Sequence, residues 1–253
     1  MAGRRPLSKG ELILKSFGID SPEQIDLEAI AFGLGAKVRY RKIDGSEARI
    51  VGNGVSAIIT VNEDHTPTRK RFSIAHELGH WVERHGKGGF ICAKEDISPQ
   101  NDAAKSAEAI ANSFASQLIL PSYLFDPIAA GMPINLDSAD KIRKDFKAGL
   151  TATALKLVKG TGKAAAIVCY GLQGRQWFAL SQGWPERLRL AAELNYETEA
   201  FELLYATDRG GKTTLRQEAA SRWISSIQGQ ELKVRSQSVK LAEGVVLSVI
   251  AVT

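Results

Sequence analysis

The sequence is poor in cysteine and in long apolar runs, and both scarcities exclude classes of protein. Only two of its 253 residues are cysteines, Cys92 and Cys169. Such sparse cysteine argues against a disulfide-stapled scaffold and favours a reducing compartment. No run approaches the ~20 apolar residues of a membrane-spanning helix, and no apolar run follows the basic residues at 1–10, as a secretory signal peptide would require. We therefore expect a cytoplasmic protein without a membrane partner.

A strong excess of one charge sign is also missing. The chain has 33 lysines and arginines against 28 aspartates and glutamates, a net charge of +5. This excess permits direct nucleic-acid binding but does not require it, and a solvated, mildly basic surface is the simpler interpretation. The apolar share of 44% and the charged share of 24% are those of an ordinary globular protein of one large or two small domains.

Apolar spacing in the first half of the chain predicts helices and short strands. The expected helices are 8–17, 21–34, 69–83 and 106–120, and the expected strands are 38–43, 47–53 and 56–62. The pair Asn53-Gly54 predicts a hairpin between the last two strands. The segment 57–61 could be a plain sheet strand or a sheet edge that binds substrate by strand addition.

The pattern changes beyond residue 125. Two short helices are expected at 138–146 and 151–159, around Gly149, as in a helix-turn-helix-like unit. Strands at 164–170, 176–180, 232–240 and 245–252 and a helix at 219–227 complete the expected elements. We therefore expect an α+β protein with a boundary near residues 125–165 and a mixed α/β C-terminal part.

Residues 76–80 read His76-Glu77-Leu78-Gly79-His80, a HExxH pattern within an expected helix. Residues four apart lie on one face of a helix, so both imidazoles can reach one metal ion, and neutral imidazole suits zinc. Glu77 can take a proton from an attacking water and act as the base of a peptidase. Gly79 permits close packing against a neighbouring element. Two incidentally spaced histidines are the simpler alternative, but the chain has only four.

A catalytic zinc takes three protein ligands and a water. The pattern HExxHxxGxxH would supply a third histidine, but neither its glycine nor its last histidine is in place after His80. A glutamate from the following helix is the other source, and Glu108 is the best candidate. Asn112 lies one turn further on the same face and could hydrogen-bond a ligand imidazole. Glu108 could also be a solvated carboxylate favoured by the helix dipole, and the residues alone leave both open.

Two segments carry a family resemblance. The run from Arg71 to His80, RFSIAHELGH, resembles the RFTLAHELGH signature of the ImmA/IrrE-type metallo-endopeptidases. The run from Glu108 to Pro121 is similar to their ExxANxFAxxLLMP helix, with Ile-Leu in place of Leu-Met before the proline. The resemblance covers residues 8–121 well, and the two helices and strand at 138–170 are similar to the longer, IrrE-like members.

The resemblance implies a gluzincin-like fold in which His76, His80 and Glu108 bind the metal and Glu77 is the base. The implied metal is zinc, with manganese as an alternative that the same ligands would accept. The implied partner is a protein substrate, a helix-turn-helix transcriptional repressor, whose cleavage controls stress or mobile-element genes. In the longer members a helix-turn-helix-like segment and a GAF-like domain follow the protease part.

These features predict three parts: a zincin-like metallopeptidase domain at 1–125, a helix-turn-helix-like linker region at 126–162, and a small mixed α/β domain at 163–253. The predicted function is a metal-dependent, zinc-type endopeptidase that cleaves a regulatory protein. The alternative is a regulatory protein that sequesters a transcription factor without proteolysis. The base Glu77, which binding alone does not need, favours the peptidase.

Overall fold

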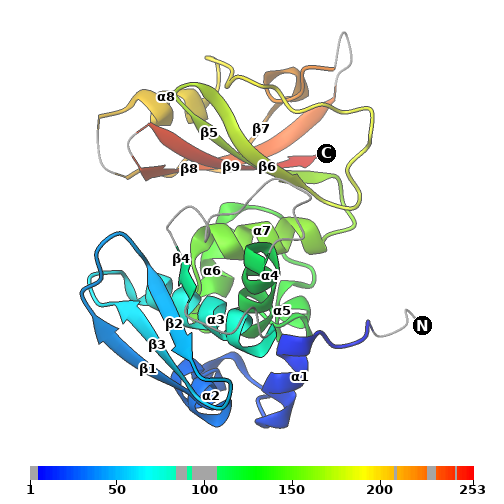
Figure 1. Cartoon of the computed structure of the whole chain (residues 1–253). Helices are drawn as coiled ribbons and strands as arrows, with labels where there is room; N and C mark the ends of the chain where they lie inside the picture. The colour runs from blue at the N-terminus through cyan, green and yellow to red at the C-terminus, as the bar shows by residue number, and fades with distance from the viewer. Residues whose placement is uncertain (1–4, 84–89, 93–106, 208–209, 227–231, 243) are drawn as a thin grey trace. The chain divides into compact units, whose positions relative to one another are not determined.

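The computed structural model describes residues 5–83, 90–92, 107–207, 210–226, 232–242 and 244–253. It divides into two compact units, the first formed by residues 1–128 and 143–149 and the second by 129–142 and 150–253. Helices and two separate sheets are present, which confirms the α+β prediction (Figure 1). The three-part domain division stays a prediction. No helix of the described residues is long and apolar enough to cross a membrane.

The first unit packs helices against one face of a small sheet. Its elements are α1 (Lys9–Ser16), α2 (Leu27–Gly33), β1 (Ala36–Arg41), β2 (Ala48–Gly52), β3 (Ala57–Asn62), α3 (Pro67–Glu83), β4 (Phe90–Cys92), α4 (Ala107–Ile119) and α5 (Ser122–Ala129), which ends at the unit boundary. The strand order is β1-β3-β2-β4, with β1 parallel to β3 and the other pairs antiparallel. Helix α3 packs on β2 and β3, and α2 packs on β1.

The alternation of side chains along these strands separates a buried face from an exposed one. Ile50 of β2 and Ile59 of β3 are register partners, and both are buried. Their neighbours Val51 and Ile58 are also register partners, but both are exposed. Because successive residues of a strand point to opposite faces, the first pair faces α3 and the second faces away from it.

Strand β3 lies inside the sheet. It pairs with β1 on one side and with β2 on the other. The interpretation of 57–61 as a sheet edge is therefore wrong, because a strand paired on both sides has no free row of N–H and C=O groups for a peptide. The hairpin predicted at Asn53-Gly54 does join β2 to β3, and Gly54 has the positive φ of +88° that favours glycine.

The helix expected over 21–34 is two separate elements. A 3-10 turn at Pro22–Gln24 is followed by α2, and Ile25 between them has a non-helical ψ of 88°. Asp26 starts α2, because its carboxylate accepts the backbone N–H groups of Glu28 and Ala29 at 3.0 and 3.1 Å. An aspartate in this position satisfies N–H groups that have no partner within the helix, so it begins a new helix instead of continuing the old one.

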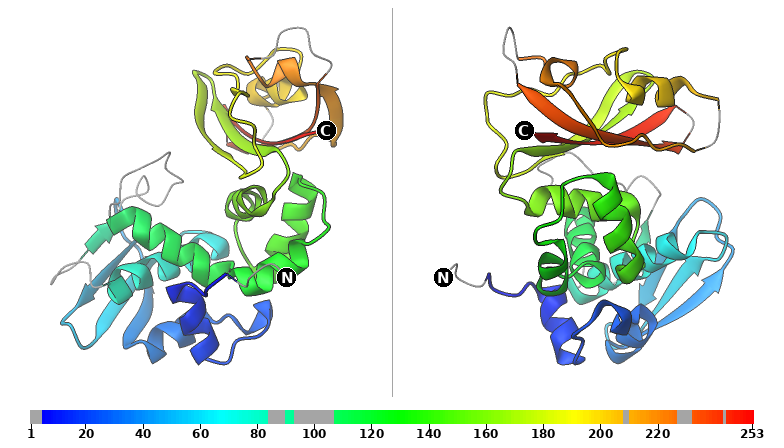
Figure 2. Two further views of the ribbon diagram at one scale, coloured as in Figure 1. Left: turned by 90° about the vertical axis from the view of Figure 1, so that its right-hand side faces the viewer. Right: turned by 180° about the vertical axis from the view of Figure 1, so that it is seen from behind.

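The second unit is built on an antiparallel sheet of order β6-β5-β9-β8-β7. Its elements are α6 (Leu136–Phe146, with residues from 143 in the first unit), α7 (Leu150–Gly160), β5 (Ala165–Gly171), β6 (Gly174–Leu180), α8 (Glu199–Tyr205), β7 (Arg216–Ala219), β8 (Lys233–Ala242) and β9 (Val245–Val252). Helices α7 and α8 lie on opposite faces of this sheet (Figure 2). Strand β5 is buried along its whole length because both of its faces are covered.

The helix expected over 219–227 is wrong, and residue 227 lies outside the described residues. Strand β7 ends at Ala219, and only a 3-10 turn at Ala220–Arg222 follows. Trp223 is buried, as an apolar helix face would require, but its carbonyl accepts the N–H of Ala191 at 2.8 Å. The N–H groups of Trp223 and Ile224 still donate to the carbonyl of Ala220, but Ile224 then pairs with Leu190 and no α-helix follows, so the apolar spacing was misleading. The sequence patterns also predicted no helix at α8.

Candidate metal centre

Helix α3 carries the HExxH residues in its buried half. Pro67 stands at its start, where the missing N–H of proline is no loss, and the carbonyl of Thr66 accepts the N–H of Lys70 at 2.9 Å. His76, Glu77 and His80 are 0, 0 and 1% exposed. Burying three ionisable side chains on consecutive turns is unfavourable unless they have polar or charged partners. The burial of these side chains therefore indicates a role other than packing in the core.

Helix α4 lies directly against α3 at Gly79. A Cβ atom on Gly79 would stand 2.8 Å from the Cα of Ala111 and 3.1 Å from its carbonyl oxygen. No larger residue fits this approach without moving one of the helices. The close packing predicted from Gly79 is confirmed, and it brings the first turn of α4, which carries Glu108, next to the two histidines.

Three predicted ligand residues converge at this contact. Nε2 of His76 lies 3.1 Å from Nε2 of His80 and 3.1 Å from a carboxylate oxygen of Glu108, whose other oxygen lies 3.4 Å from Nε2 of His80. Ligand atoms about 2.0–2.1 Å from a tetrahedral zinc ion stand roughly 3.3 Å apart. The donor set and its spacing therefore fit a divalent ion held by His76, His80 and Glu108. The side chain of Glu108 is 26% exposed, whereas both imidazoles are buried.

Asn112 contacts the nitrogen of His76 that points away from the other candidate ligands. Its Nδ1 lies 3.0 Å from the Oδ1 of Asn112, one turn after Glu108 on α4. In the tautomer with Nδ1–H, His76 donates to this oxygen and directs the lone pair of Nε2 toward His80 and Glu108. The ring of Phe72 stacks on the imidazole at a centroid distance of 6.3 Å. Phe72 was not predicted as a site residue, although its position one helical turn before His76 was a usable signal.

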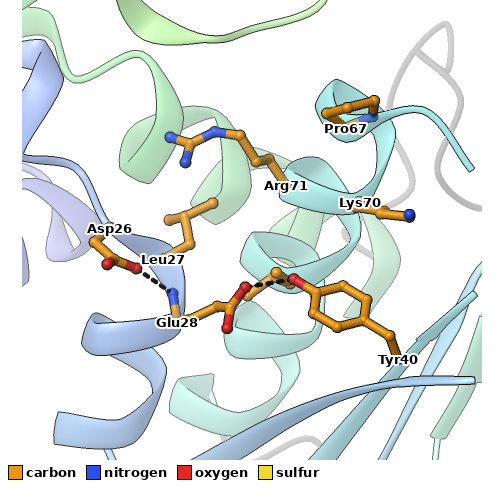
Figure 3. Close-up of a pocket in the computed structure, with 8 residues that line it drawn as sticks. Asp26, Leu27, Glu28, Tyr40, Pro67, Lys70 and Arg71 are labelled. Carbon is orange, nitrogen blue, oxygen red and sulfur yellow. Dashed lines mark hydrogen bonds between the residues drawn. The ribbon is translucent and has the colours of Figure 1, made fainter. Parts of the chain in front are cut away.

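A hollow of about 220 Å³ lies elsewhere on the first unit, between α2, β1 and α3 (Figure 3). Its α3 residues include Arg71 and Ile74, and across it the hydroxyl of Tyr40 donates to Glu28 at 2.5 Å. Burial raises the pKa of Tyr40, and its hydrogen bond to Glu28 raises it further. Ile74 and His76 are two residues apart, which is roughly 200° around a helix. The hollow is therefore on the opposite face of α3 from the metal centre.

The part of the chain that carries this centre is similar to a known protein family. Residues 20–158 match the family of the IrrE N-terminal-like domain (Peptidase_M78), a span of more than half of the 253 residues. No curated protein sequence matches the chain. A solved structure of a Mycobacterium tuberculosis transcriptional regulator has a similar fold, with a TM-score of 0.61 and 12% sequence identity over 96% of this chain and 75% of that chain. At that identity the likeness concerns the fold alone.

Proposed function

The chain belongs to the Peptidase_M78 family of IrrE N-terminal-like domains, and from this premise we propose that it is a metal-dependent endopeptidase that cleaves a specific regulatory protein. One observation carries the proposal. Two imidazoles and a carboxylate from two helices meet at 3.1 to 3.4 Å from one another. Nitrogen and carboxylate donors at this spacing suit zinc, and manganese is the alternative metal.

Glu77 is the general base in this proposal. Its side chain is completely buried in the same turn of α3 as His76. It would accept a proton from the attacking water and return that proton to the amine of the leaving peptide, so that one water is consumed for each peptide bond broken. A bound divalent ion would supply Lewis acidity, which polarises the scissile carbonyl and lowers the pKa of water.

His76, His80 and Glu108 would hold the ion, and Asn112 would orient His76. The 3.0 Å contact between Asn112 and His76 supports these roles, because an imidazole ring held through one nitrogen presents its other nitrogen in a single direction. The partial exposure of Glu108 supports access of a peptide from that side.

The substrate that we propose is a helix-turn-helix transcriptional repressor, and the setting is the cytoplasm. Family membership supports a regulatory protein as substrate, and the similar solved structure is named a transcriptional regulator. We also propose the division into a metallopeptidase domain at 1–125, a helix-turn-helix-like linker region at 126–162 and a GAF-like domain at 163–253. The separate core of the β5–β9 sheet supports a distinct C-terminal domain.

Replacing the base tests the proposal. Glu77→Gln keeps the shape of the side chain and removes its ability to accept a proton. Co-expression with helix-turn-helix repressors of the same genome, followed by mass spectrometry, should show cleavage by the original protein and a loss of about 10²-fold or more in the variant. Bound metal, measured by elemental analysis, should not change. Glu83→Gln, at the end of the same helix, is the matched control and should cleave normally.

Two outcomes would count against the peptidase. Cleavage by Glu77→Gln at the original rate would remove Glu77 from the mechanism. Relief of repression by Glu77→Gln without any cleavage would favour the alternative, a protein that sequesters the transcription factor.

A further inference from the structure

The outward face of the β1-β3-β2 sheet carries basic side chains from two strands. Lys37, Arg39 and Arg41 are alternate residues of β1, so they point to the same side of the sheet. Arg49 of β2 joins them, because Arg39 and Arg49 are both register partners of Thr60 in β3. The four basic side chains are exposed.

These charges are not neutralised by the described part of the chain. None of the four forms an ion pair with a described residue, and Arg39 only donates a hydrogen bond from Nε to the hydroxyl of Thr60 at 2.8 Å. Glu47, which precedes β2, is buried and already pairs with Arg69 and His65. Like charges gathered on one face are destabilising, and an anionic partner would relieve this repulsion.

Exposed apolar side chains form a row beside the four basic side chains. Val51 and Ile58 are register partners on the same face and are 56% and 41% exposed. Val55 in the adjoining hairpin is 84% exposed. Helices α2 and α3 cover the other face of the sheet, and no described helix covers this one (Figure 1). The face therefore offers exposed branched side chains next to unpaired arginines.

We propose that this face docks an acidic, amphipathic segment of a partner protein. Carboxylates of the partner would bind Arg39, Arg41 and Arg49, and its apolar side chains would cover Val51 and Ile58. Arginine forms paired hydrogen bonds to carboxylates, and protein interfaces combine an apolar centre with enriched arginine. A nucleic-acid backbone would satisfy the arginines but would leave the apolar row exposed. The docking face lies on the opposite side of the sheet from α3 and is therefore independent of the metal centre.

A binding assay on the full chain tests the docking face without using peptidase activity. The probe is a fluorescent amphipathic peptide with leucines on one side and glutamates on the other, followed by anisotropy at low and high salt. Arg39→Glu/Arg49→Glu should weaken binding by about tenfold or more, because each reversal replaces an attraction with a repulsion. Arg41→Glu/Arg49→Glu should do the same without disturbing the bond to Thr60. Val51→Ser/Ile58→Ser should weaken binding by about threefold or more, since it removes apolar contact.

The control is Arg187→Glu/Arg235→Glu, which changes the net charge equally at two exposed arginines of the second unit. It should bind the probe as the original protein does, and a peptide with lysines in place of the glutamates should not bind. The proposal would be overturned if the control lost as much peptide affinity as the docking-face variants. It would also be overturned if both Arg39→Glu/Arg49→Glu and Arg41→Glu/Arg49→Glu bound the peptide as the original protein does. So would failure of the acidic peptide to bind while a short DNA duplex binds through the same arginines.

Discussion

The side chain of Asn112 contacts one nitrogen of the His76 imidazole, while the other nitrogen faces the remaining candidate ligands. In the proposed centre, Asn112 therefore acts through His76. Residues of this kind determine how well a site binds without touching the ion. Glu11 of α1 is a second positioning residue, because its buried carboxylate accepts the backbone N–H of Ser122 at the start of α5. At the scale of single residues, polar side chains such as Asn112 and Glu11 therefore hold other side chains and helices in position.

Asn112→Ala should weaken metal binding about 10- to 100-fold, because the ring of His76 loses the contact that orients it. Titration of the metal-free protein with zinc in a competing chelator measures the affinity. Ser113→Ala changes the neighbouring, exposed residue of α4 and should bind as before. An unchanged affinity in Asn112→Ala would show that His76 needs no support from α4.

Glu11 should make the stability of the protein sensitive to acid. Burial alone would raise its pKa, but hydrogen bonds from the amide and hydroxyl of Ser8 and the amide of Ser122, with the charge of Arg5, hold the pKa below the usual 4.5. A lowered pKa means that the folded state prefers the charged form. The stabilisation is therefore complete above pH 4.5 and is lost as the pH falls through the folded-state pKa.

Glu11→Gln should lower the free energy of unfolding by on the order of 2 kcal/mol at neutral pH, since charge-assisted hydrogen bonds are lost. The variant should also lose less stability than the original protein on acidification. Urea unfolding at neutral pH and near pH 4 measures both. Glu186→Gln, at an exposed glutamate, should match the original protein. A parallel loss of stability in Glu11→Gln and the original protein on acidification would contradict this account.

At the scale of elements, the centre is a product of the contact between α3 and α4. Each helix forms for local reasons, but neither holds all three candidate ligands. Their separation is set where Gly79 meets Ala111. A displacement of a few tenths of an ångström there would move Glu108 relative to both histidines.

Gly79→Ala should destabilise the first unit and weaken metal binding, because the added methyl group would meet the backbone of α4 at 2.8 Å. Overpacking of this kind costs about 1–3 kcal/mol. Gly160→Ala, in α7, adds the same methyl group where no atom lies within 4 Å, so it should leave both properties nearly unchanged. Thermal melts with and without zinc compare the two. Equal melting temperatures of Gly79→Ala and Gly160→Ala would show that α3 and α4 move apart without cost to accept the methyl group.

At the scale of the whole molecule, the metal donors and the C-terminal sheet belong to different units. The three candidate ligands lie in the first unit, whereas Tyr170 and Trp223 belong to the core of the second. The family match ends at residue 158, so the β5–β9 sheet lies beyond it. A ligand that binds one unit should therefore stabilise that unit first.

Calorimetry of the full chain should show this selectivity. Zinc at a hundredfold excess over its dissociation constant should stabilise the first unit by about 2.7 kcal/mol, because it binds only the folded state. The transition of the second unit should shift less, and a chelator should reverse the change. His76→Ala/His80→Ala should show no shift. Absence of any bound divalent ion, with no response to zinc or manganese, would refute the central proposal.

The sequence alone determined the local features of this protein. The spacing of His76 and His80 placed two imidazoles on one helix face, and Asn53-Gly54 predicted its hairpin, because both depend on backbone geometry within a few residues. The family resemblance implied Glu108 as a ligand, but only the tertiary structure placed it beside the histidines. Only the tertiary structure decided that β3 is an interior strand and that the segment around Trp223 forms no α-helix. These features depend on packing and hydrogen bonds between distant segments, which the spacing of residues within one segment does not determine.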